Sequence, residues 1–221
     1  MLIRKKLRRF LSALLSIVML MLFPAISTAE NTADLSRFTD VMPGQWYYSA
    51  IEYVVTNGYF NGVSEDRFAP GEPMTRAMFV TVLGRLALVD PTADPAPDFH
   101  DTVPGSYYSG YVTWAAENDI VRGLTPGFFG PDVCITREQI ATFLYRYARH
   151  IGLDTTVDLI ATPSTFNSDT GISTWAVKPM VWAVSKGIMQ GTPNGLEPQA
   201  QATRAQVAQM IYNFSKLTEN Q

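Results

Sequence analysis

Apolar residues recur at helical spacing in two kinds of segment, and the chain carries three copies of each. In the first kind, residues 46–57, apolar side chains stand at positions 46, 50, 51, 54 and 55, a period typical of a helix and not of a strand. Gly58 and Gly187 follow this segment in the first and third copies. We expect the helix to end there, because glycine adopts the left-handed cap conformation most easily. The second copy has Asp119 there, which is a weaker stop.

A second helix follows in each copy and begins after a threonine, whose hydroxyl can cap the exposed N–H groups of the first turn. Gln139 and Gln206 complete a capping box in the second and third copies. Behind the caps, spacings of three and four give each helix one apolar stripe. The stripes are Phe79, Val82, Leu83, Leu86; Ile140, Phe143, Leu144; and Val207, Met210, Ile211, Phe214. Helices this short cannot bury their stripes alone, so we predict one all-α domain with a shared core.

Fixed landmarks link the two helices of each copy. Phe38-Thr39-Asp40 recurs as Phe99-His100-Asp101 and, more loosely, at residues 166–169. The others are an aromatic residue (Trp46, Tyr107, Trp175), a glycine (Gly62, Gly123, Gly191), a Phe-x-Pro or Leu-x-Pro turn (68–70, 129–131, 196–198) and a Thr-Arg pair (75–76, 136–137, 203–204). Self-alignment defines repeat 1 (38–86), repeat 2 (99–147) and repeat 3 (166–214). The segments between them are too short to hold an independent domain.

The first 29 residues have the layout of a secretory signal peptide. Five cations fall within the first nine residues, an apolar run follows at 10–23, and small residues stand at 27–29. We expect cleavage after Ala29, a leader at 30–37 and no membrane contact afterwards. The alternative is an uncleaved membrane anchor, but the apolar run is shorter than the roughly 20 residues that span a bilayer.

Charge and composition exclude several classes of function. The net charge is −3, and beyond the first nine residues the chain carries 12 cations against 20 anions. An acidic body argues against nucleic-acid binding, which needs a basic face. One cysteine, Cys134, and two histidines, His100 and His150, are too few for a Cys/His metal site. We therefore expect no metal and no cofactor.

The order and spacing of the landmarks closely resemble the S-layer homology module of bacterial cell-surface proteins. The resemblance implies that three modules form one pseudo-threefold helical bundle. It also implies that the grooves between modules bind an anionic secondary cell-wall polysaccharide, often bearing pyruvate ketals. The expected protein is a secreted, non-catalytic anchor on the cell wall of a Gram-positive-type bacterium.

The resemblance assigns Arg76, Arg137 and Arg204 to contact with the anionic sugar. A guanidinium can form a bidentate pair with a pyruvyl carboxylate, and the helix N-terminus adds N–H groups. Because the first turn of a helix is normally solvent-accessible, we expect these arginines to be exposed and replaceable without loss of the fold. The alternative is that each arginine pairs with an acid of the bundle, for example Asp40 or Asp101. Those acids are themselves expected to accept bonds in turns or caps.

Two other landmarks are candidates for sugar contact, each with a structural alternative. An aromatic side chain offers a flat platform for the C–H face of a sugar, or it belongs to the helical core; these residues are Trp46, Tyr107 and Trp175. A glycine lets a backbone approach a sugar closely, or it supplies a turn that needs a positive φ; these residues are Gly62, Gly123 and Gly191. Repeat 3 diverges most, with Ser168 and Leu196 at landmark positions, so we expect its groove to bind most weakly.

Two other functions compete with the anchor. A surface adaptor or S-layer-associated structural protein would bind the wall polymer and also a protein partner. A wall hydrolase would need two carboxylates at a set separation, and no such pair stands out from the repeats.

The signal peptide gives the first testable prediction. Terminal sequencing of the extracellular protein is expected to give Glu30 as the first residue. An intact N-terminus in the membrane fraction would favour the anchor instead.

Overall fold

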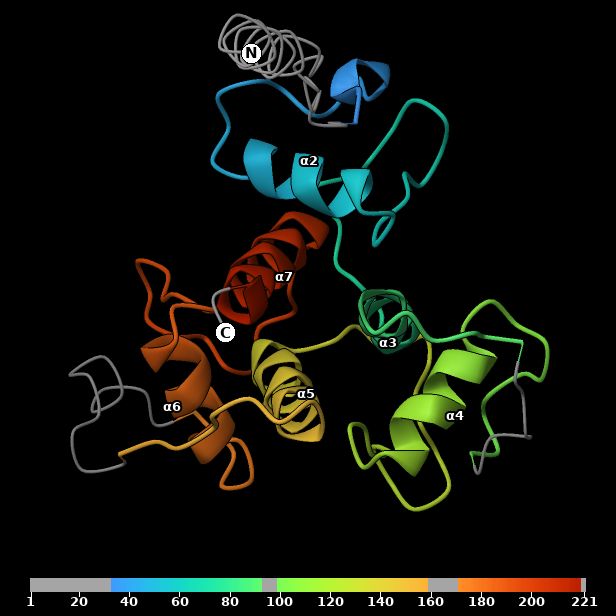
Figure 1. The fold of residues 1–221 in the computed structure, drawn as a ribbon, viewed down its shortest axis with the longest axis vertical. Helices are drawn as coiled ribbons and strands as arrows, with labels where there is room; N and C mark the ends of the chain where they lie inside the picture. The colour runs from blue at the N-terminus through green and yellow to red at the C-terminus, as the bar shows by residue number, and fades with distance from the viewer. Residues whose placement is uncertain (1–32, 93–98, 159–170, 220–221) are drawn as a thin grey trace, which may run out of the picture. The chain divides into compact units, whose positions relative to one another are not determined.

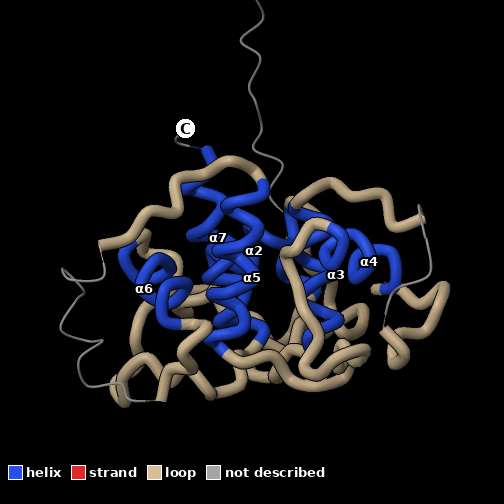
Figure 2. The backbone as a smooth tube through the Cα atoms, turned by 90° about the horizontal axis from the view of Figure 1, so that it is seen from below, coloured by secondary structure: helices blue, strands red, loops and turns tan. Residues whose placement is uncertain are grey.

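The computed structural model describes residues 33–92, 99–158 and 171–219, which belong to one compact unit. They form a short 3-10 turn and six α-helices. These are η1 (Leu35–Arg37), α2 (Tyr48–Thr56), α3 (Arg76–Leu86), α4 (Ser109–Glu117), α5 (Arg137–His150), α6 (Val177–Ser185) and α7 (Arg204–Glu219). Extended backbone within these ranges occurs only as isolated bridges, so the all-α prediction is confirmed (Figure 2). The predicted signal peptide and the landmark at 166–169 lie outside the described residues.

The helices pair between repeats. The first helix of repeat 2, α4, packs on α3 of repeat 1, and α6 of repeat 3 packs on α5 of repeat 2. The first helix of repeat 1, α2, packs on α7 at the other end of the chain (Figure 1). The first helix of each repeat therefore packs on the second helix of the repeat before it, and the first helix of repeat 1 packs on the second helix of repeat 3. The three repeats form a closed ring.

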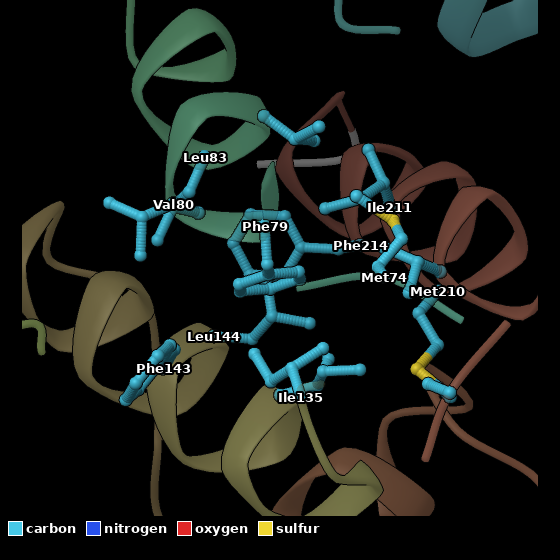
Figure 3. Packing of buried hydrophobic residues seen from close by; sticks show 14 of the residues in the cluster. Met74, Phe79, Val80, Leu83, Ile135, Phe143, Leu144, Met210, Ile211 and Phe214 are labelled. Atoms are coloured by element: carbon cyan, nitrogen blue, oxygen red, sulfur yellow. The ribbon is translucent and has the colours of Figure 1, made fainter. Parts of the chain in front are cut away.

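The second helices α3, α5 and α7 supply the centre of the core. The aromatic rings of Phe79 and Phe143 have centroids 6.1 Å apart, and those of Tyr147 and Phe214 lie 5.8 Å apart. Side chains of all three helices converge here (Figure 3). The predicted apolar stripes are buried, except that Leu86 is half-buried. The shared core that the stripes predicted is confirmed.

Main-chain hydrogen bonds also link the three repeats in a cycle, just before the N-termini of α3, α5 and α7. The N–H of Met74 donates to the carbonyl of Ala202 (3.0 Å), that of Ala202 to Ile135 (3.1 Å), and that of Ile135 to Met74 (2.8 Å). The three residues occupy equivalent positions, each immediately before the capping threonine. The repeats are thus joined by backbone as well as by side chains.

The helix ends follow the predicted local chemistry. Thr136 and Gln139 form a capping box, and Thr203 and Gln206 exchange the same two bonds at 3.1 and 3.3 Å. The stop at Asp119 has a left-handed φ of 55°, like the two predicted glycine stops at 70°. No helix in the described part of the chain is long and apolar enough to cross a membrane.

The closed ring predicts that two repeats cannot fold without the third. In a fragment of residues 30–158, α2 lacks α7 and α5 lacks α6, so two helix faces are left in water. We expect no cooperative thermal transition in circular dichroism. Adding residues 159–221 as a separate chain should restore it. A fragment that melts cooperatively alone would indicate an open array, whose repeats contact only their neighbours.

Candidate functional site

The three landmark arginines are buried, contrary to the expectation that they would be exposed. Arg76, Arg137 and Arg204 are 2, 3 and 7% exposed. Arg76 reaches into repeat 2, where its Nε donates to the carbonyl of Phe129 (2.9 Å) and its Nη2 to that of Arg122 (2.8 Å). The side chain thus joins two neighbouring repeats.

The same pair of bonds recurs around the ring. Arg137 of repeat 2 donates to two carbonyls of repeat 3, and Arg204 of repeat 3 donates to two carbonyls of repeat 1. The acceptors are Leu196 (2.7 Å) and Gln190 (2.6 Å) for Arg137, and Phe68 (2.7 Å) and Asn61 (2.7 Å) for Arg204. Each pair consists of the residue before the landmark glycine and the first residue of the following Phe-x-Pro or Leu-x-Pro turn.

The acids weighed as alternative partners of these arginines bind main-chain groups of the turns. The carboxylate of Asp40 accepts the N–H groups of Phe68 (2.9 Å) and Ala69 (2.7 Å). Asp101 accepts the equivalent groups of Phe129 and Gly130, both at 2.7 Å. The acids therefore brace the turns whose carbonyls the arginines bind, which confirms their expected role as turn acceptors.

Burial changes the electrostatics of two of these arginines. Desolvation lowers the pKa of Arg76 to about 10, against the opposing effect of the Asp101 charge. Desolvation also lowers the pKa of Arg204, with Glu72 and Asp40 opposing it. The guanidinium carbon of Arg76 lies 4.6 Å from the ring centroid of Phe129. Arg76 therefore keeps its charge at neutral pH, held by carbonyl oxygens and an aromatic face.

The helix N-termini are also occupied, so the expectation that they offer N–H groups to a ligand is wrong. In α3 the N–H of Arg76 donates to Val133 (2.9 Å) and that of Ala77 to Pro131 (3.0 Å). The next N–H, of Met78, donates to the Thr75 hydroxyl. In α5 and α7 the first two N–H groups are taken likewise by carbonyls of repeats 3 and 1: Ala200, Pro198, Glu72 and Pro70.

Two of the three landmark glycines are required by their own loops. A Cβ on Gly62 would lie 2.5 Å from the carbonyl oxygen of Ser64, and one on Gly123 would lie 2.5 Å from that of Phe128. Gly191 is looser, at 3.3 Å from Gly195. The three lie outside the positive-φ region, so the explanation by left-handed geometry is wrong.

The landmark aromatics are exposed. Trp46, Tyr107 and Trp175 are 61, 59 and 51% exposed, so their assignment to the core is wrong. Trp46 precedes α2, which begins at Tyr48 rather than at position 46. These side chains are free to meet a ligand.

Two grooves combine landmarks from three different repeats. One, of about 450 Å³, is lined by Trp46 of repeat 1, Arg137 of repeat 2 and Gly191 of repeat 3. The other, of about 320 Å³, is lined in the same way by Tyr107 of repeat 2, Arg204 of repeat 3 and Gly62 of repeat 1. The remaining candidates, Arg76, Gly123 and Trp175, occupy the third equivalent set of positions. Arg76 donates a hydrogen bond to the carbonyl of Arg122, the residue before Gly123. Trp175 is the aromatic residue at the equivalent position of repeat 3.

Sequence reasoning missed polar residues that lie along the same grooves. Gln209 and Asn213 line the larger groove, and Thr81 and Arg85 line the smaller one at the equivalent positions. They follow the landmark arginine by five and nine residues, so the repeat alignment could have found them. The carboxylate of Glu138, which is 2% exposed, was also missed. It accepts bonds from the main chain and hydroxyl of Ser173 and from Gln199, and so holds repeat 3.

The family model described as S-layer homology domain matches residues 37–78, 98–141 and 168–208. The chain belongs to the S-layer homology domain family. Each match overlaps one of the three repeats and ends six to eight residues before the end of that repeat. The helix ring and its grooves are thus the structure of three tandem S-layer homology repeats.

Proteins similar in sequence to this chain include both surface proteins and enzymes. The chain is 30% identical over 212 residues to an endoglucanase of Bacillus sp. (strain KSM-635), covering 94% of this chain and 22% of the relative. It is 29% identical over 179 residues to the S-layer protein sap of Bacillus anthracis, covering 81% and 21%. The chain therefore spans about a fifth of the length of these curated relatives. The S-layer homology repeats and S-layer relatives support a cell-surface anchoring module.

The buried arginine generates a stability prediction. Arg76→Ala removes two charge-assisted bonds and leaves two carbonyls of repeat 2 without their donor. We expect the free energy of unfolding to fall by about 3 kcal/mol, measured by urea denaturation. The matched control is Arg67→Ala, since the side chain of Arg67 is 55% exposed and lies at 3.8 and 3.7 Å from the carboxylates of Asp40 and Glu72. It should cost less than about 1 kcal/mol. Equal losses in the two variants would contradict a structural role for Arg76.

Proposed function

We propose that the chain is a non-catalytic anchor that attaches to the cell wall by binding an anionic secondary cell-wall polysaccharide in the grooves between its repeats. The observation that supports this most directly is the repeated composition of the two grooves. Each joins an exposed aromatic residue, a landmark glycine and a landmark arginine from three different repeats. The exported form would begin at Glu30 and act at the surface of a Gram-positive-type cell.

The chemistry of the grooves suits a charged sugar. An exposed indole or phenol can cover the C–H face of a pyranose and still donate a hydrogen bond from its polar end. In the larger groove, the amides of Gln206, Gln209 and Asn213 can exchange bonds with hydroxyl groups. Arg137 lies in the same lining and contributes positive charge in a largely desolvated position. A pyruvate ketal would place its carboxylate there.

The smaller groove presents a more apolar wall. Met74, Met78 and Val82 lie in its lining beside Arg85 and Arg204. Apolar contact with ring carbons and a charge pair with a carboxylate are both available in this groove. We propose that it takes the same polymer as the larger groove, with less hydrogen bonding to hydroxyls.

An adaptor that also binds a protein is the second candidate function. The observation that favours it is a set of exposed apolar side chains in repeat 2. Leu124, Phe128 and Val133 are 43, 49 and 48% exposed, and Leu124 and Val133 both lie against Gly130. A protein partner would cover these side chains while the grooves hold the polymer.

A sedimentation experiment separates the candidates. The purified protein is mixed with isolated cell walls, before and after mild acid removes the secondary polymer. Loss of co-sedimentation after stripping supports polysaccharide binding. Unchanged binding to stripped walls would point to peptidoglycan or to a protein receptor.

The exposed aromatics give a prediction for the grooves. Trp46→Ala and Tyr107→Ala should each weaken wall binding by about tenfold, because each removes the exposed platform of one groove. The double variant should lose more than either alone, since two grooves on one molecule bind with avidity. Melting temperatures should stay unchanged, because neither side chain belongs to the core.

Phe128→Ala is the matched control. Phe128 is similarly exposed, at 49%, and lies outside the lining of both grooves. It should leave wall binding intact. Wall affinity unchanged in the double variant of Trp46 and Tyr107 would refute the groove assignment.

A further inference from the structure

The loop after α4 and the end of α5 carry a basic pocket of about 340 Å³ that contains none of the nine candidate groove residues. Its lining is Asn118, Asp119, Arg122, Arg146, Arg149 and His150. Three guanidinium groups and an imidazole thus surround one hollow in a protein whose body is acidic.

Two elements build the pocket. Arg146, Arg149 and His150 stand three and four residues apart in the last turns of α5, which places them on one face of the helix. Arg122 comes from the loop that follows α4. The main chain of Arg122 is fixed, because its carbonyl accepts the bond from the buried Arg76. The ring therefore holds a loop cation opposite the helix cations.

Helix electrostatics explain only part of this cluster. Cations in the last turn interact favourably with the helix dipole, which accounts for Arg149 and His150. They do not account for Arg122, which faces Arg146 from another element. The pKa of Arg146 is lowered by burial and then by the charge of Arg122, with Asp119 opposing. The two positive charges repel each other, and a bound anion would offset this repulsion.

The other repeats do not concentrate charge in this way. The positions of Arg122 and Arg146 are taken by Asn61 and Arg85 in repeat 1, and by Gln190 and Asn213 in repeat 3. Within the pocket, the one carboxylate is that of Asp119, 3.9 Å from Nη2 of Arg122. Both side chains of this pair are largely exposed, at 87 and 72%, so the pair is weak.

We propose that this pocket binds a dianionic phosphate group, either free phosphate or the end group of a phosphomonoester. Three guanidinium groups and one carboxylate leave a charge of +2 in the lining, which a dianion balances. A guanidinium can donate to two oxygens at once. A tetrahedral phosphate has more oxygens than a planar carboxylate, so it can accept from several guanidinium groups together. This site is independent of the proposed polysaccharide grooves.

Calorimetric titration of the purified protein at low ionic strength tests the proposal, with inorganic phosphate, methyl phosphate, dimethyl phosphate and acetate as probes. Inorganic phosphate or methyl phosphate should bind at least tenfold more tightly than dimethyl phosphate or acetate. Preference for inorganic phosphate indicates the free ion, and equal or tighter binding of methyl phosphate indicates a monoester. Absence of phosphate binding, or acetate binding as tight as phosphate, would overturn the proposal.

Two variants with opposite expected effects locate the site. The double variant Arg122→Gln with Arg149→Gln should weaken phosphate binding at least tenfold, because it removes two exposed guanidinium groups. Asp119→Asn should tighten it severalfold, because it removes the competing carboxylate. Asparagine also tolerates the left-handed backbone at this position.

The matched control removes the same charge elsewhere. Arg37 and Lys178 are exposed and lie outside the pocket, so Arg37→Gln with Lys178→Gln should leave phosphate binding unchanged. Circular dichroism melts check that each variant is folded. If the control double variant loses as much affinity as the pocket double variant, phosphate is attracted only by the general charge of the protein, and the assigned site is wrong.

Discussion

Each landmark arginine is buried in the repeat that follows its own, and the closed ring depends on that contact. A guanidinium taken out of water is costly unless its donors are satisfied. Here Nε and Nη2 of Arg76 meet two main-chain carbonyls, and Arg137 and Arg204 do the same around the ring. Because repeat 3 reaches back to repeat 1, the first and last helices of the domain pack together. The contact thus turns a tandem array into a closed domain.

The same contact explains why the landmarks occur together. The arginine needs the carbonyl before the glycine and the carbonyl that opens the Phe-x-Pro turn. In repeat 1, Asp40 fixes that turn by accepting the N–H groups of Phe68 and Ala69. Ala69 has a φ of 59°, in the left-handed region, so the turn needs this support. The aspartate, glycine, turn and arginine form one hydrogen-bonded unit, with the arginine supplied by the neighbouring repeat.

Local features of this structure could be predicted from the sequence, whereas contacts between repeats could not. The helices, the capping boxes and the left-handed stop at Gly58 follow from the residues of one short segment, and they are confirmed. The position of Arg76 depends on a loop of another repeat. A helical period that included position 46 also overextended the first helix, so Trp46 was weighed as a core residue. It stands before the helix and is exposed.

Since all three repeats carry the same landmarks, self-alignment cannot say which repeat's arginine meets which repeat's glycine. The grooves resolve this: each takes its aromatic residue, glycine and arginine from three different repeats. Most of the lining of the larger groove nevertheless comes from repeat 3, and most of the lining of the smaller groove comes from repeat 1. The weaker binding expected of repeat 3 stays a prediction. The change from Phe to Leu at position 196 of repeat 3 leaves the contact with Arg137 intact. Arg137 donates to the main-chain carbonyl of Leu196, and any side chain at that position leaves this carbonyl in place. The larger groove, which contains Gly191 of repeat 3, keeps its arginine and its aromatic residue from the two less divergent repeats.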